Sequence, residues 1–332
     1  MAHVSVVAEP AVLGVTDRGR GGVAVAVAGF VLRRVGLLLV LLTLVFCAVS
    51  VLPGDAARAA LDRGASPETV AAKRHELGLD RPLPQRFWSW LNGLVTGDFG
   101  TTAHGRPIAD LLAASAPQTL LLGGIAFAVT VFASMACGMW WATKPDGWAA
   151  RVLQPATAMV VALPEFVVAA GLIAVFSFAA GWLPAVTVAG RSGFPASADM
   201  LVLPALALAL PQTGWNTRVV RGALADAARA PHVEHAELEG LSPTRLMTRH
   251  IFPVALPAIA ASYATTVGML LGGALVVESL FNYPGLGALL AGSVADRDTG
   301  LAAATAAAAG VIIMCVLLTA DGLRAWAMRG RR

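Results

Sequence analysis

Two kinds of side chain in this 332-residue sequence could do chemistry. Glu165 follows Pro164 inside a long apolar stretch, and Glu278 stands near the end of another. A carboxylate central in a membrane helix costs roughly 2.5–3.5 kcal/mol, so such a group tends to face a cavity or a partner. His232, Glu234 and His235 carry metal-ligating atoms, and two histidines three apart share a helix face. The open chemistries are therefore charge binding within a membrane and metal coordination.

The surrounding composition is that of a membrane protein. Apolar residues make up 57% of the chain and charged residues 13%, and the mean hydropathy is +0.71. A bilayer core of roughly 30 Å needs about 20 apolar residues in a helix. Six stretches approach or exceed that length, near 30–52, 118–142, 153–181, 200–220, 255–280 and 300–323. We therefore expect an all-α integral membrane protein with six transmembrane helices.

Arginine and lysine placement sets the expected orientation. Fifteen of the 24 lie in the amino end, the 143–152 and 217–254 loops and the carboxyl tail. Positive residues stay on the cytoplasmic side, so both termini should be cytoplasmic, and the basic tail should meet anionic lipid, not nucleic acid. The expected parts are a cytoplasmic segment 1–29, a first transmembrane helix 30–52, an external subdomain 53–117, a five-helix transmembrane core 118–323 with a cytoplasmic loop 221–254, and a basic tail 324–332.

The cytoplasmic loop contains the sequence HVEHAELEGLSPTRLMTRHIFPVALP, residues 232–257. Residues from Asp226 favour helix until Gly240, where a left-handed conformation suits a helix end. Ser242 can cap and Pro243 can open a second helix, and Pro253 and Pro257 are expected at the return into the membrane. The pattern predicts two short helices joined by a turn, and a solvated loop is the alternative.

The same segment resembles a known family. Glu234, His235, Ala236 and Gly240 stand at the positions of the glutamate–alanine–alanine, three residues, glycine signature of permease subunits of binding-protein-dependent ABC importers, with His235 in place of alanine. Further blocks look like the dipeptide, oligopeptide and nickel permeases of that family, at Leu52–Asp55, Glu76–Gly100, Gly105–Leu120 and Leu270–Leu290.

The resemblance implies a type I ABC importer permease in the bacterial inner membrane. Its expected partners are two ATPase subunits, a second related permease subunit and an extracytoplasmic substrate-binding protein. The implied ATPase-coupling residues are Glu234, His235, Ala236, Gly240, Leu241 and Arg245. Ala236 and Gly240 are expected to be small because bulk would prevent close approach to the ATPase. ATP-Mg belongs on the partner subunits, because this non-catalytic chain has no phosphate-binding glycine loop and needs no cofactor of its own.

The two carboxylates receive separate hypotheses. Glu165 is expected to line the translocation path and meet a cationic group such as a peptide amino terminus, and a polar contact between subunits is the alternative. Glu278 is a candidate path residue as well, but a hydrogen-bonded carboxylate that stabilises the following turn is preferred. The expected substrate is a dipeptide or oligopeptide, and nickel is the other possibility within the family.

Three rival functions use the same residues. A metal site at His232, Glu234 and His235 lacks further ligands of matching spacing, and Cys47, Cys137 and Cys315 each fall within a predicted span. An intramembrane serine protease of the rhomboid type would use Ser192 in the GRSG of residues 190–193, but the sixth stretch carries no histidine base. A secondary transporter would need charged relays or broken repeats in the spans, and Glu165 alone offers little support.

Overall fold

The computed structural model describes residues 20–51, 56–59, 61, 65–144, 146–190 and 193–329, with backbone alone at 20–28, 30–31, 51, 56, 59, 149, 320–321 and 323–329. The predictions for Leu52–Asp55, Ser192 and the basic side chains of the tail lie outside the described residues. The chain forms two compact units, Met1–Leu41 and Leu42–Arg332. The described part of the first unit is helical, and the second holds every element that the functional argument uses.

The described residues form helices and connecting loops, with only two isolated β-bridges, which confirms the all-α expectation. The α-helices are α1 (Arg20–Val51), α2 (Ala56–Ala59), α3 (Pro67–Glu76), α4 (Leu83–Thr96), α5 (Ile108–Thr143), α6 (Trp148–Ala162), α7 (Glu165–Leu172), α8 (Val202–Ala228), α9 (Pro231–Leu238), α10 (Pro243–Leu246), α11 (Phe252–Leu280), α12 (Leu286–Ala295) and α13 (Thr299–Arg329). Two π-helical turns, Ile173–Ala179 and Met247–Ile251, and a 3-10 turn, Ala198–Leu201, complete the set.

Four described segments are long and apolar enough to cross a membrane, at Leu32–Ser50, Ile108–Thr143, Pro243–Leu280 and Thr299–Thr319. A bent pair, Ala150–Ala162 with Glu165–Ala179, would make a fifth. The predicted count of six is not confirmed on this criterion, because α8 fails it. Polar residues such as Gln212 and Asn216 interrupt the apolar run of α8.

The third predicted span, 153–181, is broken at Pro164, where the sequence allows a kink. The chain bends by 109° between α6 and α7. Leu163 and Pro164 are extended there, with φ/ψ of −91°/128° and −60°/149°. Proline disfavours the helical conformation of the residue before it and lacks the NH that would continue the ladder. Glu165 therefore opens α7, at the break between the two halves of the bent pair.

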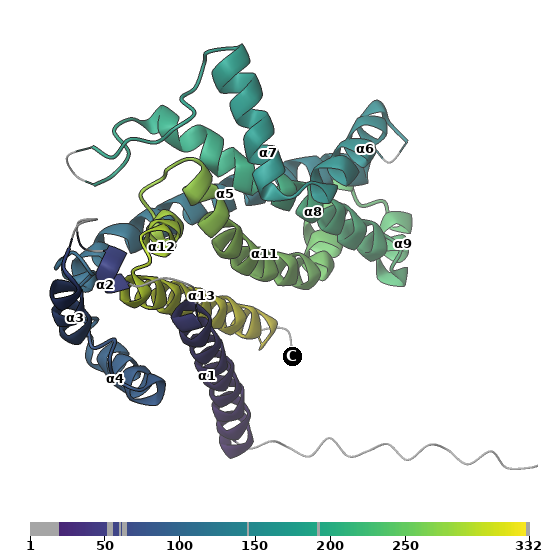
Figure 1. The fold of residues 1–332 in the computed structure, drawn as a ribbon. Helices are drawn as coiled ribbons and strands as arrows, with labels where there is room; N and C mark the ends of the chain where they lie inside the picture. The colour runs from purple at the N-terminus through teal and green to yellow at the C-terminus, as the bar shows by residue number, and fades with distance from the viewer. Residues whose placement is uncertain are drawn as a thin grey trace, which may run out of the picture. The chain divides into compact units, whose positions relative to one another are not determined.

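α8 lies at the centre of the second unit, packed between α5 and α11 (Figure 1). Its buried residues include small and apolar side chains such as Leu203, Ala207 and Leu208, which join a core with Leu122 and Ala274. Close helix packing of this kind relies on small residues. α8 is covered by protein on most of its surface, which is why it can carry polar side chains that a lipid-facing helix could not.

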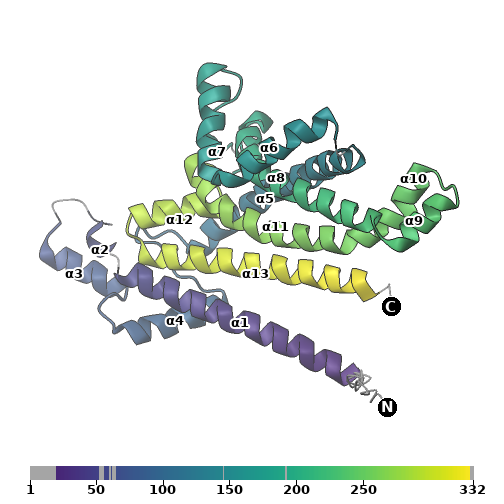
Figure 2. The same cartoon turned by 90° about the vertical axis from the view of Figure 1, so that its right-hand side faces the viewer.

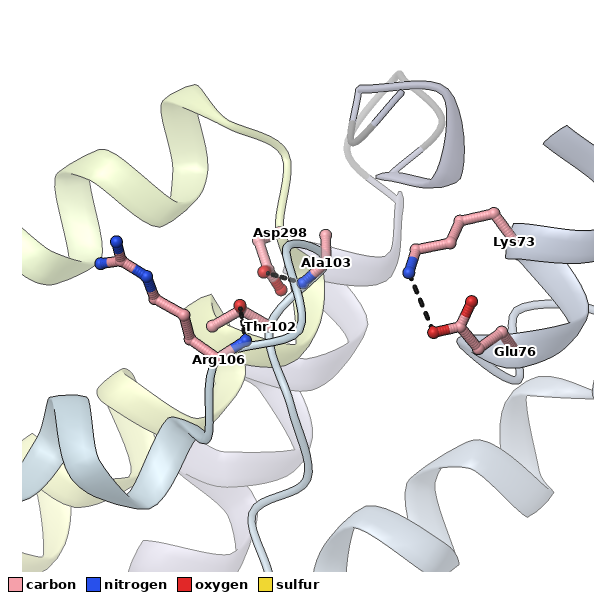
Figure 3. A network of polar contacts seen from close by, with 6 residues as sticks. All are labelled: Lys73, Glu76, Thr102, Ala103, Arg106 and Asp298. Atoms are coloured by element: carbon pink, nitrogen blue, oxygen red, sulfur yellow. Dashed lines mark hydrogen bonds and ion pairs between the residues drawn. The ribbon is translucent and has the colours of Figure 1, made fainter. Parts of the chain in front are cut away.

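The segment before α5 is held to the start of α13. The Ala103 amide donates to Asp298 Oδ2 at 2.7 Å, and the Arg106 amide donates to Thr102 Oγ1 at 3.1 Å, as Figure 3 shows. Asp298 Oδ1 also accepts from the Leu301 amide at 3.0 Å, so one carboxylate caps α13 and anchors the loop. The chain turns at Gly78, which has a φ of +64°, between α3 and the amphipathic helix α4.

Candidate functional site

The 232–257 segment forms the helix, turn, helix arrangement that the sequence predicts, at the end of α8 and α11 away from α12 (Figure 2). Two details differ. The helix expected from Asp226 to Gly240 is broken at Ala230, which is extended before Pro231. The second helix is continuous with the next span through the π-helical turn, so Pro253 and Pro257 lie within α11 and mark no separate re-entry.

α9 has one face packed inward and one face outward. Val233 and Ala236 are buried, and Val233 joins Leu224, Ile251 and Ala255 in an apolar cluster. Glu234, His235 and Leu238 are exposed, and 81% of Leu238 is open to solvent. The inward contacts fix the helix on α8 and α11, so the outward side chains are presented on a firm support.

Ala236 and Gly240, the two coupling residues expected to be small, each have a reason for their size within this chain. Ala236 is only 4% exposed, so it packs within this chain and is not open to a partner. Gly240 has a φ of +81°, and an added Cβ there would meet nothing within 4 Å. Its amide donates to Glu237 O at 2.9 Å, and that of Leu241 donates to Ala236 O at 3.3 Å. Within this chain, the left-handed backbone at Gly240 favours glycine.

The remaining predicted coupling residues surround this turn. Leu241 is half-buried and Arg245 is exposed on α10. Ser242 stands at the N-cap position of α10, but its hydroxyl makes no capping hydrogen bond, which corrects the capping prediction. Sequence reasoning missed Leu238. Leu238 stands two residues after the buried Ala236, so it points to the opposite side of α9, and only the structure shows which side is outward.

A second site is a cavity of about 280 Å³ between α6, α7, α8 and α11. Glu165, Gln212, Trp215 and Met269 are among its lining residues. Glu165 is half-buried, and its carboxyl carbon would lie 3.4 Å from a Cβ placed at Gly273 of α11. The carboxylate also sits in the first turn of α7, where the helix dipole favours negative charge.

Gln212 adds a second acceptor to this cavity, and sequence reasoning missed it. The side chain is 2% exposed and its Oε1 has no hydrogen-bond partner among the described residues. One turn further along α8, Asn216 donates to Thr266 Oγ1 at 2.8 Å and accepts from Ser262 Oγ at 2.8 Å. A buried acceptor without a partner costs free energy, so the Gln212 carbonyl oxygen is suited to bind a donor that enters the cavity.

Glu278 has the role preferred for it from sequence, a carboxylate that holds the following turn. It is fully buried, and its Oε2 accepts from the Gly287 amide at 2.6 Å. An added Cβ at Gly285 would overlap this carboxylate. Within the turn, burial raises the pKa of Tyr283 to about 12, with a smaller effect from the Glu278 charge, and its hydroxyl donates to Gln118 O at 3.1 Å.

The histidines of the α9–α10 segment, residues 231–246, do not assemble a metal centre in the described residues. His235 Nε2 lies 3.2 Å from Glu239 Oε1 in an exposed polar contact, and His232 is exposed. No group of three metal-ligating side chains is close enough to share an ion among the residues described.

Membrane-length helices, a polar cavity between them and a supported helix pair at one end define a polytopic transport protein. Residues 134–332 match the family model described as binding-protein-dependent transport system inner membrane component, and residues 27–117 match the model of its N-terminal region. The chain belongs to this family and is an ABC importer permease of the peptide and glutathione type. It is a multi-pass inner-membrane protein, and permeases of this family are generally non-catalytic.

Similar curated proteins include the glutathione transport system permease protein GsiC from three bacteria. That of Pectobacterium atrosepticum is 33% identical over 276 residues, covering 81% of this chain and 87% of the relative. That of Escherichia coli K12 is 33% identical over 262 residues, covering 79% and 83%. That of Salmonella choleraesuis is 33% identical over 274 residues, covering 81% and 87%.

Proposed function

We propose that this permease couples uptake of a peptide-like substrate to ATP hydrolysis on a separate ATPase subunit, which docks on the α9–α10 segment. The observation that carries the proposal is the outward face of α9, where exposed Leu238 lies beside Glu234 and His235 on a helix fixed from behind. Arg245 and Leu241 complete the docking surface. ATP-Mg is bound by the ATPase subunits, of which the complex contains two.

The proposed assembly also contains a second related permease subunit and an extracytoplasmic substrate-binding protein. α8 serves as a membrane span although it is polar, because neighbouring helices cover it, and this gives six spans with both termini cytoplasmic. The α9–α10 segment then lies in the cytoplasm, and the subdomain that contains α3 and α4 lies outside. Reporter fusions at each terminus and after α4 test this topology, and an external carboxyl terminus contradicts it.

Coupling is tested by Gly240→Val, compared with Gly97→Val. Both glycines have a positive φ, +81° and +79°, and neither has an atom within 4 Å of an added Cβ. Each substitution therefore costs a similar 1–2 kcal/mol of backbone strain, but only Gly240 lies in the docking segment. In proteoliposomes with all subunits, we expect Gly240→Val to lower uptake per ATP hydrolysed severalfold. Equal behaviour of the two variants would contradict coupling through this turn.

We propose further that the Glu165–Gln212 cavity lies on the translocation path and receives the ammonium group of the substrate. A carboxylate and an unpartnered carbonyl oxygen supply acceptors, and the Trp215 ring can face a cation. Glu165→Gln removes the charge at nearly constant shape, and Glu68→Gln, in the exposed first turn of α3, is its control.

The path experiment compares uptake of a dipeptide with uptake of its N-acetylated analogue. For each permease, we take the ratio of dipeptide uptake to acetylated dipeptide uptake. The binding protein is the same in wild type and variant, so its own selectivity cancels when the two ratios are compared. We expect Glu165→Gln to reduce the preference for the free ammonium about tenfold or more. A preference unchanged from wild type would exclude a path role for Glu165.

The substrate proposed is a dipeptide or oligopeptide, including glutathione-like molecules. The relatives are named for glutathione transport, and the acceptors in the cavity suit an ammonium donor. Competition of labelled dipeptide uptake by glutathione, an unrelated tripeptide and nickel ion separates the possibilities. If nickel ion competes with the labelled dipeptide and neither peptide does, the substrate assignment changes from peptide to nickel.

A further inference from the structure

A second polar cavity, of about 240 Å³, lies apart from the Glu165 site and carries the opposite charge. It is lined by Trp141 of α5, Gln154 of α6, and Arg218 and Arg221 of α8. The two arginines are three residues apart, so they share one face of α8. Among the described residues, no acidic side chain lines the cavity. Two like charges held together in this way favour an anion between them.

Both arginines lack an ionic partner among the described residues. Arg221 lies over the Trp141 ring, with Cζ 5.0 Å from the ring centroid, and its buried Nε donates to no acceptor. Arg218 is exposed and forms no ion pair or hydrogen bond with any described side chain. By contrast, Arg229 on the same helix lies 3.8 Å from Asp226. The guanidinium groups at the cavity therefore retain donors that this chain does not satisfy.

The position of the cavity indicates a membrane–water boundary. Trp140 and Trp148, beside the ends of α5 and α6, are partly exposed and pack edge to face with centroids 4.9 Å apart. Tryptophan is enriched at such boundaries. Arg218 and Arg221 precede the end of α8 at Ala228 by about 10–15 Å along the helix axis. The cavity is thus set back from the α9–α10 segment and lies on the tryptophan-bearing end of α5.

We propose that this cavity binds the phosphodiester of an anionic membrane lipid. Arg218 and Arg221 neutralise the phosphate, Gln154 can donate a further hydrogen bond, and the neighbouring tryptophans pack at the glycerol level. Arginine suits this ligand because its planar group can present two donors to one phosphate. Basic pockets between transmembrane helices bind lipid headgroups on the same principle. The proposal requires only that the chain is embedded in a membrane.

The test measures retention of labelled phosphatidylglycerol or phosphatidylcholine by the purified, delipidated transporter complex in detergent. Arg218→Gln is the main variant, because Arg218 is exposed and its loss spares the fold. Arg221→Gln is added in a double variant. Arg151→Gln is the control, since Arg151 is an exposed arginine of α6 with no partner among the described side chains, and it lies outside the cavity.

We expect Arg218→Gln to weaken phosphatidylglycerol binding about fivefold and the double variant about 25-fold, with no change for Arg151→Gln. Phosphatidylcholine should bind weakly to every form. An equal loss in Arg151→Gln would show general surface attraction and overturn the proposal, as would unchanged binding in the double variant. Displacement of lipid by equimolar inorganic phosphate would identify a free oxyanion site instead. If the arginine variants lose the ATPase subunit while lipid retention stays unchanged, the cavity binds an acidic protein partner and not a lipid.

Discussion

Leu238 should contribute measurably to ATPase binding, and the structure sets the size of the effect. Complete burial of a leucine side chain stabilises by about 1.5–3 kcal/mol, and 81% of Leu238 is available to be buried. Leu238→Ser should therefore cost about 1.2–2.4 kcal/mol of docking free energy, which is about an 8- to 60-fold weaker Kd. The serine also lowers helix propensity slightly, a smaller effect.

The measurement is a titration of the purified ATPase subunit onto immobilised permease complex in detergent. Val95→Ser on α4 is the matched control, because Val95 is also 81% exposed but lies in the segment proposed to be external. Its binding curve should overlay that of wild type. A Kd for Leu238→Ser within twofold of wild type would refute docking through the outward face of α9.

Three further substitutions test the packing that supports the sites, each read as a shift of the thermal unfolding midpoint in detergent. Gly285→Ala should destabilise the protein strongly, because the new Cβ overlaps the Glu278 carboxylate. Adding Glu278→Ala in the same chain should recover part of the lost stability, and no recovery would contradict this contact. Asn216→Leu should cost about 1–3 kcal/mol by leaving hydroxyls unpaired between α8 and α11, and a neutral effect would contradict that network. Asp298→Ala should cost about 2 kcal/mol and speed proteolysis before α5, because two backbone amides lose their acceptor; unchanged cleavage would contradict the anchor.

The sequence predicts the elements with strong local signals. Gly240 and Pro243 mark a turn and a helix start by their backbone preferences alone, and both features are present. Gly78 has a φ of +64° just after α3, and Pro84 lies in the first turn of α4. These signals are read correctly because left-handed glycine and first-turn proline depend on a few neighbouring residues.

Features that depend on packing are harder to read. Pro164 indicates a kink, but the 109° bend also requires Leu163 to leave the helix, and the apolar run conceals that. The polar character of α8 makes sense only once α5 and α11 cover it. Gln212 and Leu238 are single residues whose meaning depends on burial, and composition cannot say which glutamine lies in a cavity or which leucine lies outside.

The uninterrupted path from α10 through the π-helical turn into α11 makes this stretch a mechanical lever. Pro243–Leu280 would measure about 57 Å as an ideal helix. A tilt of about 10° around one end of such a rod displaces the other by about 10 Å, from the same helical dimensions. The far end of this stretch is the turn held by Glu278, so a small rotation at the α9–α10 segment would be amplified at that turn.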